Sequence, residues 1–278
     1  APIVLFCFNR PKHLQKTLNA LKKNLLSKKS TIHIFSDAAK VSKDKKKVEE
    51  VRLILKKLNG FGQIKIVLRN KNYGLAKNIV SGISEIFKNE NKLIVLEDDI
   101  VTSKFFLNYM NEFLNYYKND KKVASIHGYI YPIKNKYNLK YNFFIKGADC
   151  WGWGTWKRAW KKYQHKPEIL IKKLKKKNLV NEFNFDDTKN YFRMLRKNLY
   201  TDNKSWAVQW YASAFLENMV TLYPKYTYVK NIGIDGTGKN TVLKYDLNSK
   251  FISKFKIFKS KKISESLLAR KKFKQYFK

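Results

Sequence analysis

The chain has 278 residues, and 59 Lys plus Arg against 21 Asp plus Glu give it a formal net charge of +38. This length suits one large α/β domain, and no apolar run approaches the roughly 20 residues of a membrane span. Cys7 and Cys150 are its only cysteines, which argues against a disulfide framework and favours a reducing compartment. We therefore expect a cytoplasmic domain.

The basic excess invites a nucleic-acid partner. However, only seven of the 59 basic residues are Arg, whereas a nucleic-acid groove is expected to use Arg for bidentate contacts. We therefore expect other anionic partners, namely nucleotides and acidic membrane surfaces, and no nucleic acid. A basic nucleic-acid-binding protein stays open as the alternative from another class.

The first half of the chain alternates predicted strands and helices. Strands are expected at 2–8, 31–35 and 64–68, with helices opening at Pro11, in the lysine-rich stretch after Asp37, and at Leu75. This alternation predicts right-handed βαβ units and a mostly parallel sheet flanked by helices. No Gly-x-Gly-x-x-Gly follows the first strand and no Walker sequence is present, so neither a dehydrogenase nor an ATPase is supported.

The residues that organise the chain are 93–99, where four apolar residues run into Glu97-Asp98-Asp99. Four apolar residues in a row predict a central strand that is buried on both faces. Three carboxylates at its end repel each other and are costly to desolvate, so they favour a bound divalent cation that also holds phosphate oxygens. Ligands of open α/β sheets bind at this end of the strands. A solvated acidic turn is the alternative.

The second half contains a segment, 147–156, in which glycines alternate with tryptophans. We expect a flexible loop whose rings stack on a sugar or a nucleobase, although interior packing of the same rings is an equal alternative. Before this segment, 123–127 is a predicted strand; after it, 166–200 is helical, Ser205 caps a further helix, and 221–229 is a strand. A glycine-rich turn follows at 231–238.

The C-terminal 249–278 carries eleven basic residues and one acid, interleaved with aromatic and aliphatic residues. Such a segment suits an anionic membrane interface, and a terminal helix docked on the domain is the alternative. We thus divide the chain into a nucleotide-binding half at 1–128, an acceptor-binding half at 129–248, which forms a smaller helical and β annex, and a basic amphipathic segment at 249–278.

Together these residues resemble the GT-A class of nucleotide-sugar glycosyltransferases, and within it the group around N-acetylglucosaminyltransferase I. The resemblance is carried by the strand that runs into Asn9-Arg10, by Asp37 after the second strand, by Leu96-Glu97-Asp98-Asp99, and by the segment from Phe143 to Trp156. It covers roughly residues 2 to 240 and is strongest over the first 160. The implied fold is a Rossmann-like GT-A fold.

The resemblance also implies roles for individual residues. Asp99 binds a divalent metal, Mn²⁺ or Mg²⁺, with Asp98 nearby, and Trp151, Trp153 and Trp206 contact the acceptor. Residues expected to bind the nucleotide-sugar donor are Phe8, Asn9, Arg10, Asp37, Lys71, Gly74, Leu75, Ala76, Asn78, Glu97 and Asp98.

Two departures from the family pattern matter. Many relatives add a late His to the metal shell, but this chain has none beyond His165, so the metal rests on Asp99, the diphosphate and water. Inverting relatives place a base Asp between two tryptophans, yet no acid lies between Trp206 and Trp210. The base is then Asp149 or Asp202, and we prefer Asp149 for its aromatic, glycine-flanked setting.

The expected activity is transfer of a sugar from a nucleoside diphosphate, UDP first, to a hydroxyl of a glycan or a lipid-linked glycan, with inversion. We expect a bacterial hexosyltransferase of surface polysaccharide or lipooligosaccharide assembly, peripheral on the inner face of the cytoplasmic membrane. A sugar-phosphate nucleotidyltransferase is the enzymatic alternative, and an inactive scaffold of the same fold is another.

Overall fold

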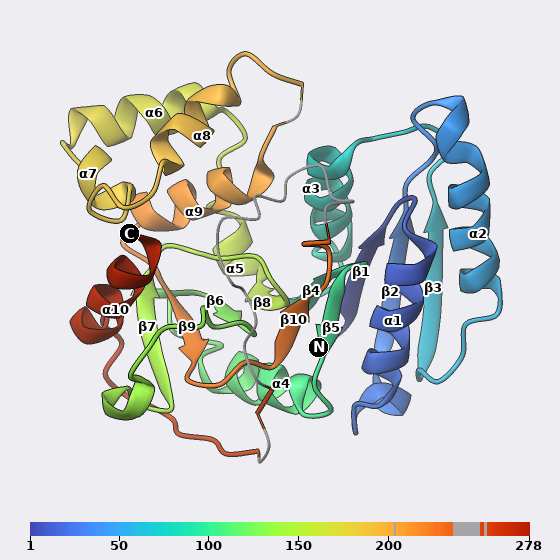
Figure 1. The fold of residues 1–278 in the computed structure, drawn as a ribbon, viewed down its shortest axis with the longest axis horizontal. Coiled ribbons are helices and arrows are strands. Elements are labelled where there is room, and N and C mark those ends of the chain that lie inside the picture. Colours follow the sequence, from blue (N-terminus) through green and yellow to red (C-terminus); the bar gives the residue numbers. More distant parts are fainter. Residues whose placement is uncertain (203, 236–250, 253–254) are drawn as a thin grey trace.

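A computed structural model of the chain describes residues 1–202, 204–235, 251–252 and 255–278. One eight-stranded sheet forms its centre, in the order β3-β2-β1-β4-β8-β6-β9-β7 (Figure 1). Its strands are β1 Ile3–Cys7, β2 Thr31–Ser36, β3 Gln63–Leu68, β4 Lys92–Glu97, β6 Val123–His127, β7 Asn142–Lys146, β8 Trp153–Trp156 and β9 Val220–Pro224. A separate two-stranded sheet pairs β5 (Ile100–Thr102) with β10 (Val229–Asn231).

Helices cover both faces of the large sheet. Residues of α1, α2 and α4 pack in one apolar cluster, against the face that carries Ile3 and Leu5, and residues of α3, α5 and α9 pack against the face of Val4 and Phe6. The helices are α1 Pro11–Lys22, α2 Lys45–Lys56, α3 Leu75–Ile86, α4 Phe106–Tyr116, α5 Lys157–Trp160, α6 Pro167–Lys176, α7 Val180–Phe183, α8 Tyr191–Lys197, α9 Trp206–Leu216 and α10 Leu267–Phe277.

The predicted α/β architecture with a mostly parallel sheet is confirmed. Strands β3, β2, β1 and β4 pair in parallel, as do β6 and β9, whereas β8 and β7 run antiparallel to their neighbours. Leu93 to Leu96 of β4 are almost completely buried, as expected of a central strand. The chain moves outward from β1 to β3 and then returns to place β4 on the other side of β1. This reversal is a topological switch point, where ligands of such sheets bind.

The glycine–tryptophan segment differs from its prediction as a loop. Trp153–Trp156 is an interior strand, β8, that joins β4 to β6. Trp153 is 0% exposed, because a strand between two others in a covered sheet buries both of its faces. Leu114 lies only 3.0 Å from where a Cβ on Gly154 would sit, so glycine lets α4 pack close to this strand. Interior packing therefore accounts for this part of the segment.

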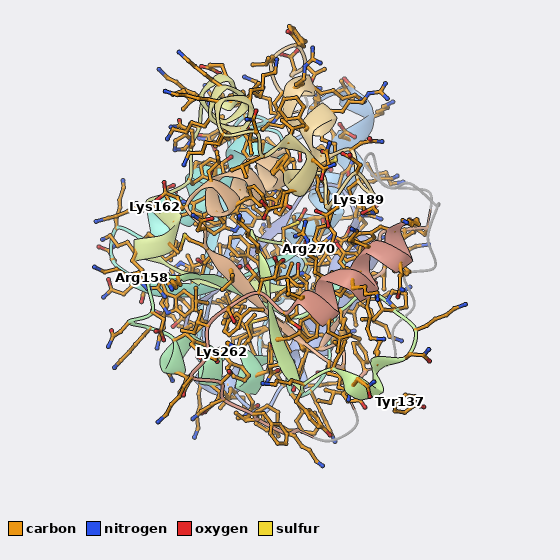
Figure 2. The ribbon with its side chains drawn as sticks, turned by 90° about the vertical axis from the view of Figure 1, so that its left-hand side faces the viewer. Tyr137, Arg158, Lys162, Lys189, Lys262 and Arg270 are labelled. Atoms are coloured by element: carbon orange, nitrogen blue, oxygen red, sulfur yellow. The ribbon has the colours of Figure 1, made fainter. Side chains whose placement is uncertain are left out.

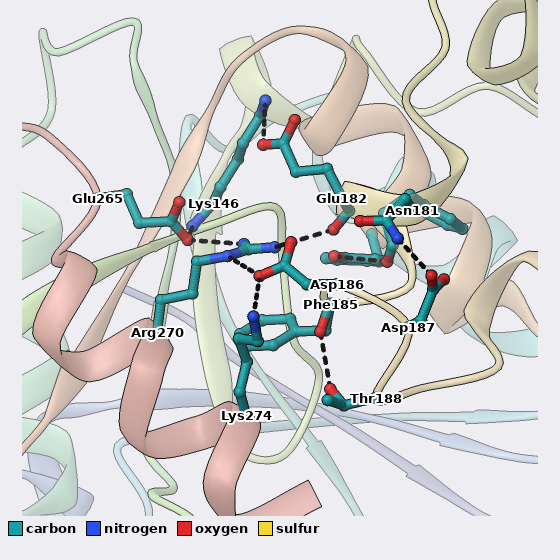
Figure 3. Close-up of polar contacts among 12 residues, drawn as sticks. Lys146, Asn181, Glu182, Phe185, Asp186, Asp187, Thr188, Glu265, Arg270 and Lys274 are labelled. Carbon is teal, nitrogen blue, oxygen red and sulfur yellow. Dashed lines mark hydrogen bonds and ion pairs between the residues drawn. The ribbon is translucent and has the colours of Figure 1, made fainter. Parts of the chain in front are cut away.

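The C-terminal helix α10 docks on the domain beside β7 (Figure 1). Phe273 and Phe277 are buried in a cluster with Phe143 and Tyr223. The aromatic face of α10 is thus docked on the domain, which was the alternative to membrane contact for this helix. The guanidinium group of Arg270 donates to Asp186 and to Glu265, which fastens the helix to the loop after α7 (Figure 3).

The remaining basic side chains lie mainly at the surface, where lysines project around the outline of the molecule (Figure 2). Lys162, for example, is half exposed and pairs with Glu217. Among the described residues, no helix combines the length and the apolar character that crossing a bilayer requires.

Candidate active site

The candidate site lies at the switch point between the carboxyl ends of β1 and β4. Asp98 is only 8% exposed, and its Oδ2 accepts a hydrogen bond of 3.2 Å from the backbone N–H of Phe8, which follows β1. The Thr17 hydroxyl of α1 donates to the backbone oxygen of Asp98 at 2.8 Å. These bonds fix the acidic turn against both β1 and α1. Asp98 is therefore not part of a solvated acidic turn, which was the alternative to a cation site.

Burial sets the electrostatics of the three acids. Desolvation, together with the charges of Asp99 and Asp98, raises the pKa of Glu97 to about 8. Desolvation and the charge of Asp99 raise the pKa of Asp98 to about 7, and desolvation also raises the pKa of Asp99. Raised values mean that the protein supplies too little positive charge for three ionised carboxylates. A cation bound at this turn would stabilise their ionised forms.

The cationic partner of Asp99 is Arg10, which directly precedes α1. Its Nη1 lies 2.8 Å from Asp99 Oδ2, and its Nη2 lies 3.3 Å from Asp235 Oδ1. His13, in the first turn of α1, also contacts Asp235. The turn 231–235 lies directly on the acids, because the Ile232 N–H donates to the Asp99 backbone oxygen at 2.9 Å. The site therefore joins the start of α1, the end of β4 and the turn after β10.

Asp37, expected to contact the nucleotide, holds a loop in this structure. Its Oδ1 accepts from the N–H groups of Ala38 and Tyr73, and its Oδ2 accepts from the N–H of Gly74 and the side chain of Asn72. Four such bonds match the acceptor capacity of a carboxylate. Asp37 thus shapes the loop that precedes α3. Gly74 has a φ of +72°, a conformation that glycine adopts without strain.

The other predicted donor residues border the same loop or the end of β1. Asn9 donates to Asp44 at 2.8 Å, and Asn78 is buried and accepts from Arg69. Lys71 and Leu75 are exposed, whereas Phe8 and Ala76 are half-buried.

Asp149, the preferred base, is the centre of a polar cluster at the ends of β6 and β9. Its Oδ2 accepts hydrogen bonds of 3.0 Å from the hydroxyls of Tyr131 and Tyr223, and its Oδ1 accepts from the Cys150 N–H. The side chain keeps 20% exposure, so a hydroxyl of a bound molecule could reach it. Asp202, the second candidate, lies in the exposed loop between α8 and α9.

The segment that carries Asp149 lies against the end of the acidic turn, because a Cβ on Gly152 would come within 3.3 Å of the side chain of Ile100, which directly follows the acids. The charges of Asp149, Glu97 and Asp99 also add to desolvation in raising the pKa of the Cys150 thiol. His127 Nε2 accepts from the Trp151 N–H, and burial lowers the pKa of the imidazole. The ring is therefore neutral and carries its proton on Nδ1.

The three tryptophans expected at the acceptor site have different surroundings. Trp151 is half-buried beside the Asp149 cluster and packs edge-on against Tyr129, with ring centroids 4.9 Å apart. Trp153 and Trp206 stack on each other in the interior, at 5.8 Å. Of the three rings, Trp151 is the one placed to contact a ligand.

Sequence reasoning missed His13 and Asp235 at the acids and the two tyrosines that hold Asp149. A His two residues after Pro11 on a predicted helix carried no signal, whereas Asp235 stood in a glycine-rich turn that was singled out. The part of that turn at 236–238 lies outside the described residues. Within the described part of the chain, no three His, Cys, Asp or Glu side chains surround a common metal position.

No family model and no curated protein matches the chain. Among solved structures it is similar to TarS residues 1–349 from S. aureus, with 12% identity, a TM-score of 0.44, and coverage of 82% of this chain and 60% of that one. A second similar structure is the mannosyltransferase PcManGT from Pyrobaculum calidifontis in complex with GDP-Man and Mn²⁺ (10% identity, TM-score 0.33, 46% and 35% covered). A third is a cytidylyltransferase from Leptospira borgpetersenii (11% identity, TM-score 0.36, 58% and 62% covered).

Proposed function

We propose that the protein is a glycosyltransferase that moves a sugar from a nucleoside diphosphate to a hydroxyl acceptor. The observation that carries this proposal is the set of three carboxylates with raised pKa values beside Arg10, at the switch point of a mostly parallel sheet. Such a site needs a cation and can hold a diphosphate. Both are required where a diphosphate is the leaving group.

Asp99, with Asp98 nearby, fits a divalent cation whose remaining ligands are diphosphate oxygens and water. The raised pKa values support this fit, because they show a shortage of positive charge at these two side chains. The bound cation would supply Lewis-acid neutralisation of the charge that develops on the diphosphate. Arg10, and Lys71 from the exposed loop, would add electrostatic stabilisation of the same charge.

Asp149 is the proposed base that accepts the proton of the acceptor hydroxyl. Two tyrosine hydroxyls orient its carboxylate, its side chain reaches solvent, and its loop adjoins the acidic turn. Asp202 is less favoured because it lies in an exposed loop beside α9. A transfer that inverts the anomeric carbon needs such a base within hydrogen-bond reach of the acceptor hydroxyl, and inversion is therefore part of the proposal. Trp151 would line the acceptor side of the site.

The nucleotide would lie along the loop 71–78, which Asp37 holds in shape, with Phe8 and Asn9 at the end of β1. A UDP-sugar donor, a glycan or lipid-linked acceptor, and work at an anionic membrane in bacterial surface-glycan assembly complete the proposal. The finer family placement near N-acetylglucosaminyltransferase I stays a prediction.

The proposal is tested by incubating the protein with a panel of nucleotide sugars, Mn²⁺ or Mg²⁺, and simple sugar acceptors, while release of the nucleoside diphosphate is measured. UDP- and GDP-sugars come first, since structures of TarS and PcManGT contain UDP-GlcNAc and GDP-Man. Stimulated release of UDP or GDP supports the proposal. Release of pyrophosphate from a nucleoside triphosphate and a sugar phosphate would instead identify a nucleotidyltransferase.

A further inference from the structure

Arg10 and His13, at the start of α1, hold a carboxylate that comes from more than 200 positions later in the chain. Asp235 Oδ1 lies 3.3 Å from Arg10 Nη2, and Asp235 Oδ2 lies 3.0 Å from His13 Nε2. Arg10 Nη2 and His13 Nε2 are themselves 3.0 Å apart. Both oxygens of one carboxylate are therefore held by this pair, which we name the Arg10–His13 pair.

Another anion can replace Asp235 in its contact with the Arg10–His13 pair. One imidazole nitrogen cannot both accept a hydrogen bond from Arg10 and donate one to Asp235, so His13 satisfies only one of these neighbours at a time. Asp235 is 42% exposed, and an ion pair with so much solvent access contributes little stability. An anion with more charge could displace it.

The turn that carries Asp235 lies close against the acids. A Cβ on Gly233 would come within 2.1 Å of Asp99 Oδ2 and 2.8 Å of Arg10 Nη1. Glycine therefore permits an approach that brings Asp235 to the Arg10–His13 pair, beside the carboxylates proposed to bind a cation. Asp235 thereby occupies the guanidinium and imidazole nitrogens that suit a phosphate, next to the Asp99–Arg10 pair.

We propose that the Arg10–His13 pair is a diphosphate-binding site and that Asp235 is an internal substitute for the phosphate in the free protein. Carboxylate and phosphate oxygens are recognised by the same guanidinium geometry. A diphosphate enters by displacing Asp235 from both side chains, so His13 is a donor-binding residue and Asp235 an internal competitor. This inference rests on the proposed function for the identity of the donor, but not for the anion site itself.

The test is titration calorimetry with inorganic pyrophosphate in chelator, so that no metal ion takes part. Asp235→Asn removes the competing charge with little change in shape, and we expect it to bind pyrophosphate about three- to tenfold more tightly than the unaltered protein. His13→Ala should bind it more weakly. Asp120→Asn, which removes a charge from the turn before β6, is the matched control and should leave the affinity unchanged. Unchanged or weaker binding by Asp235→Asn overturns the inference.

A double variant separates displacement from a general charge effect. If Asp235 competes by occupying His13, the gain from Asp235→Asn should shrink in the His13→Ala background. Equal gains in both backgrounds overturn the inference. Sugar transfer is measured on the same samples: tighter pyrophosphate binding without any transfer leaves this inference standing and removes the proposed function. Sugar transfer together with unchanged pyrophosphate affinity of Asp235→Asn removes this inference and leaves the proposed function standing.

Discussion

The hydroxyl of Tyr131 donates to Asp149 Oδ2 at 3.0 Å, while the ring of the same tyrosine packs edge-on against Phe273 and Phe277 of α10. One side chain thus joins the proposed base to the C-terminal helix. The basic end of the chain is therefore part of the support for the candidate site. The position of Asp149 should therefore depend on the docking of α10, and this dependence can be measured.

Tyr131→Phe removes one of the two hydroxyls that orient Asp149 and keeps the ring that packs against α10. Because hydrogen bonds to charged groups contribute about 1.5–3 kcal/mol, we expect kcat to fall roughly ten- to a hundredfold. The KM for the donor should change little, since Tyr131 and Asp149 are not among the residues proposed to bind the donor. Steady-state kinetics with a saturating acceptor measure both constants. Tyr137→Phe, on a side chain that is 89% exposed, is the control, and an unaltered kcat in Tyr131→Phe would count against Asp149 as the base.

The docking of α10 should weaken in acid. Hydrogen bonds from Arg270 hold the pKa of Asp186 below its ordinary value, so the ionised carboxylate favours the docked helix. Because the folded-state pKa is the lower one, ionised Asp186 stabilises the docked helix fully above the unfolded-state pKa of about 3.9. This stabilisation is lost as the pH falls through the folded-state value. Hydrogen exchange of the amides of 267–277 between pH 6 and pH 3 measures it.

In that experiment Asp186→Asn should reduce the acid-induced loss of protection at α10, because it removes one of the two carboxylates that pair with Arg270 and leaves Glu265 as the other. Asp120→Asn again serves as a control with the same change of charge. Protection of α10 that stays constant to pH 3, in a domain that remains folded, would contradict the role of the Asp186–Arg270 pair (Figure 3).

Gly233→Ala places a methyl group where Asp99 Oδ2 and Arg10 Nη1 now lie. The turn 231–235 must then move away from the acids, which disturbs both the Asp99–Arg10 pair and the position of Asp235. We expect weaker binding of the nucleoside diphosphate, about tenfold, with a melting temperature within a few degrees of the original. Gly62→Ala, whose methyl group would lie 2.9 Å from the backbone oxygen of Lys28, before β2, is a suitable comparison. Normal binding by Gly233→Ala would show that this turn does not form part of the site.

Residues that follow periodic patterns were predictable from the sequence. The alternation of apolar strands and amphipathic helices gave the parallel order of the first half, and four consecutive apolar residues identified β4. Parallel strands end at one edge of the sheet, so Arg10 and the acids at 97–99 were expected at the same edge, whereas the strand order that makes this edge a switch point came from the structure. In physical terms, local periodicity specifies an element, and right-handed crossovers then bring the strand ends together.

Contacts that depend on a strand inserted antiparallel between two others were not predictable. Strand β8 is four residues long, contains a glycine, and lacks alternation because both of its faces are buried, so it resembled a loop. Asp235 and Tyr131 reach the site through a turn and a long excursion whose path no periodicity describes. Asp37 was expected at the ligand, but its bonds to the loop at 72–74 depend on a backbone shape that the sequence does not encode locally.

The central claim is that the acids after β4 bind a cation that in turn binds a nucleoside diphosphate. Calorimetric titration of UDP into the protein, with Mn²⁺ and then with chelator, tests it most directly when repeated on Asp99→Asn and on the control Asp120→Asn. The account predicts binding that chelator weakens by at least tenfold, and an Asp99→Asn variant that stays folded but binds with no dependence on Mn²⁺. Equal affinity of the unaltered protein and of Asp99→Asn, each with Mn²⁺ and with chelator, would contradict it.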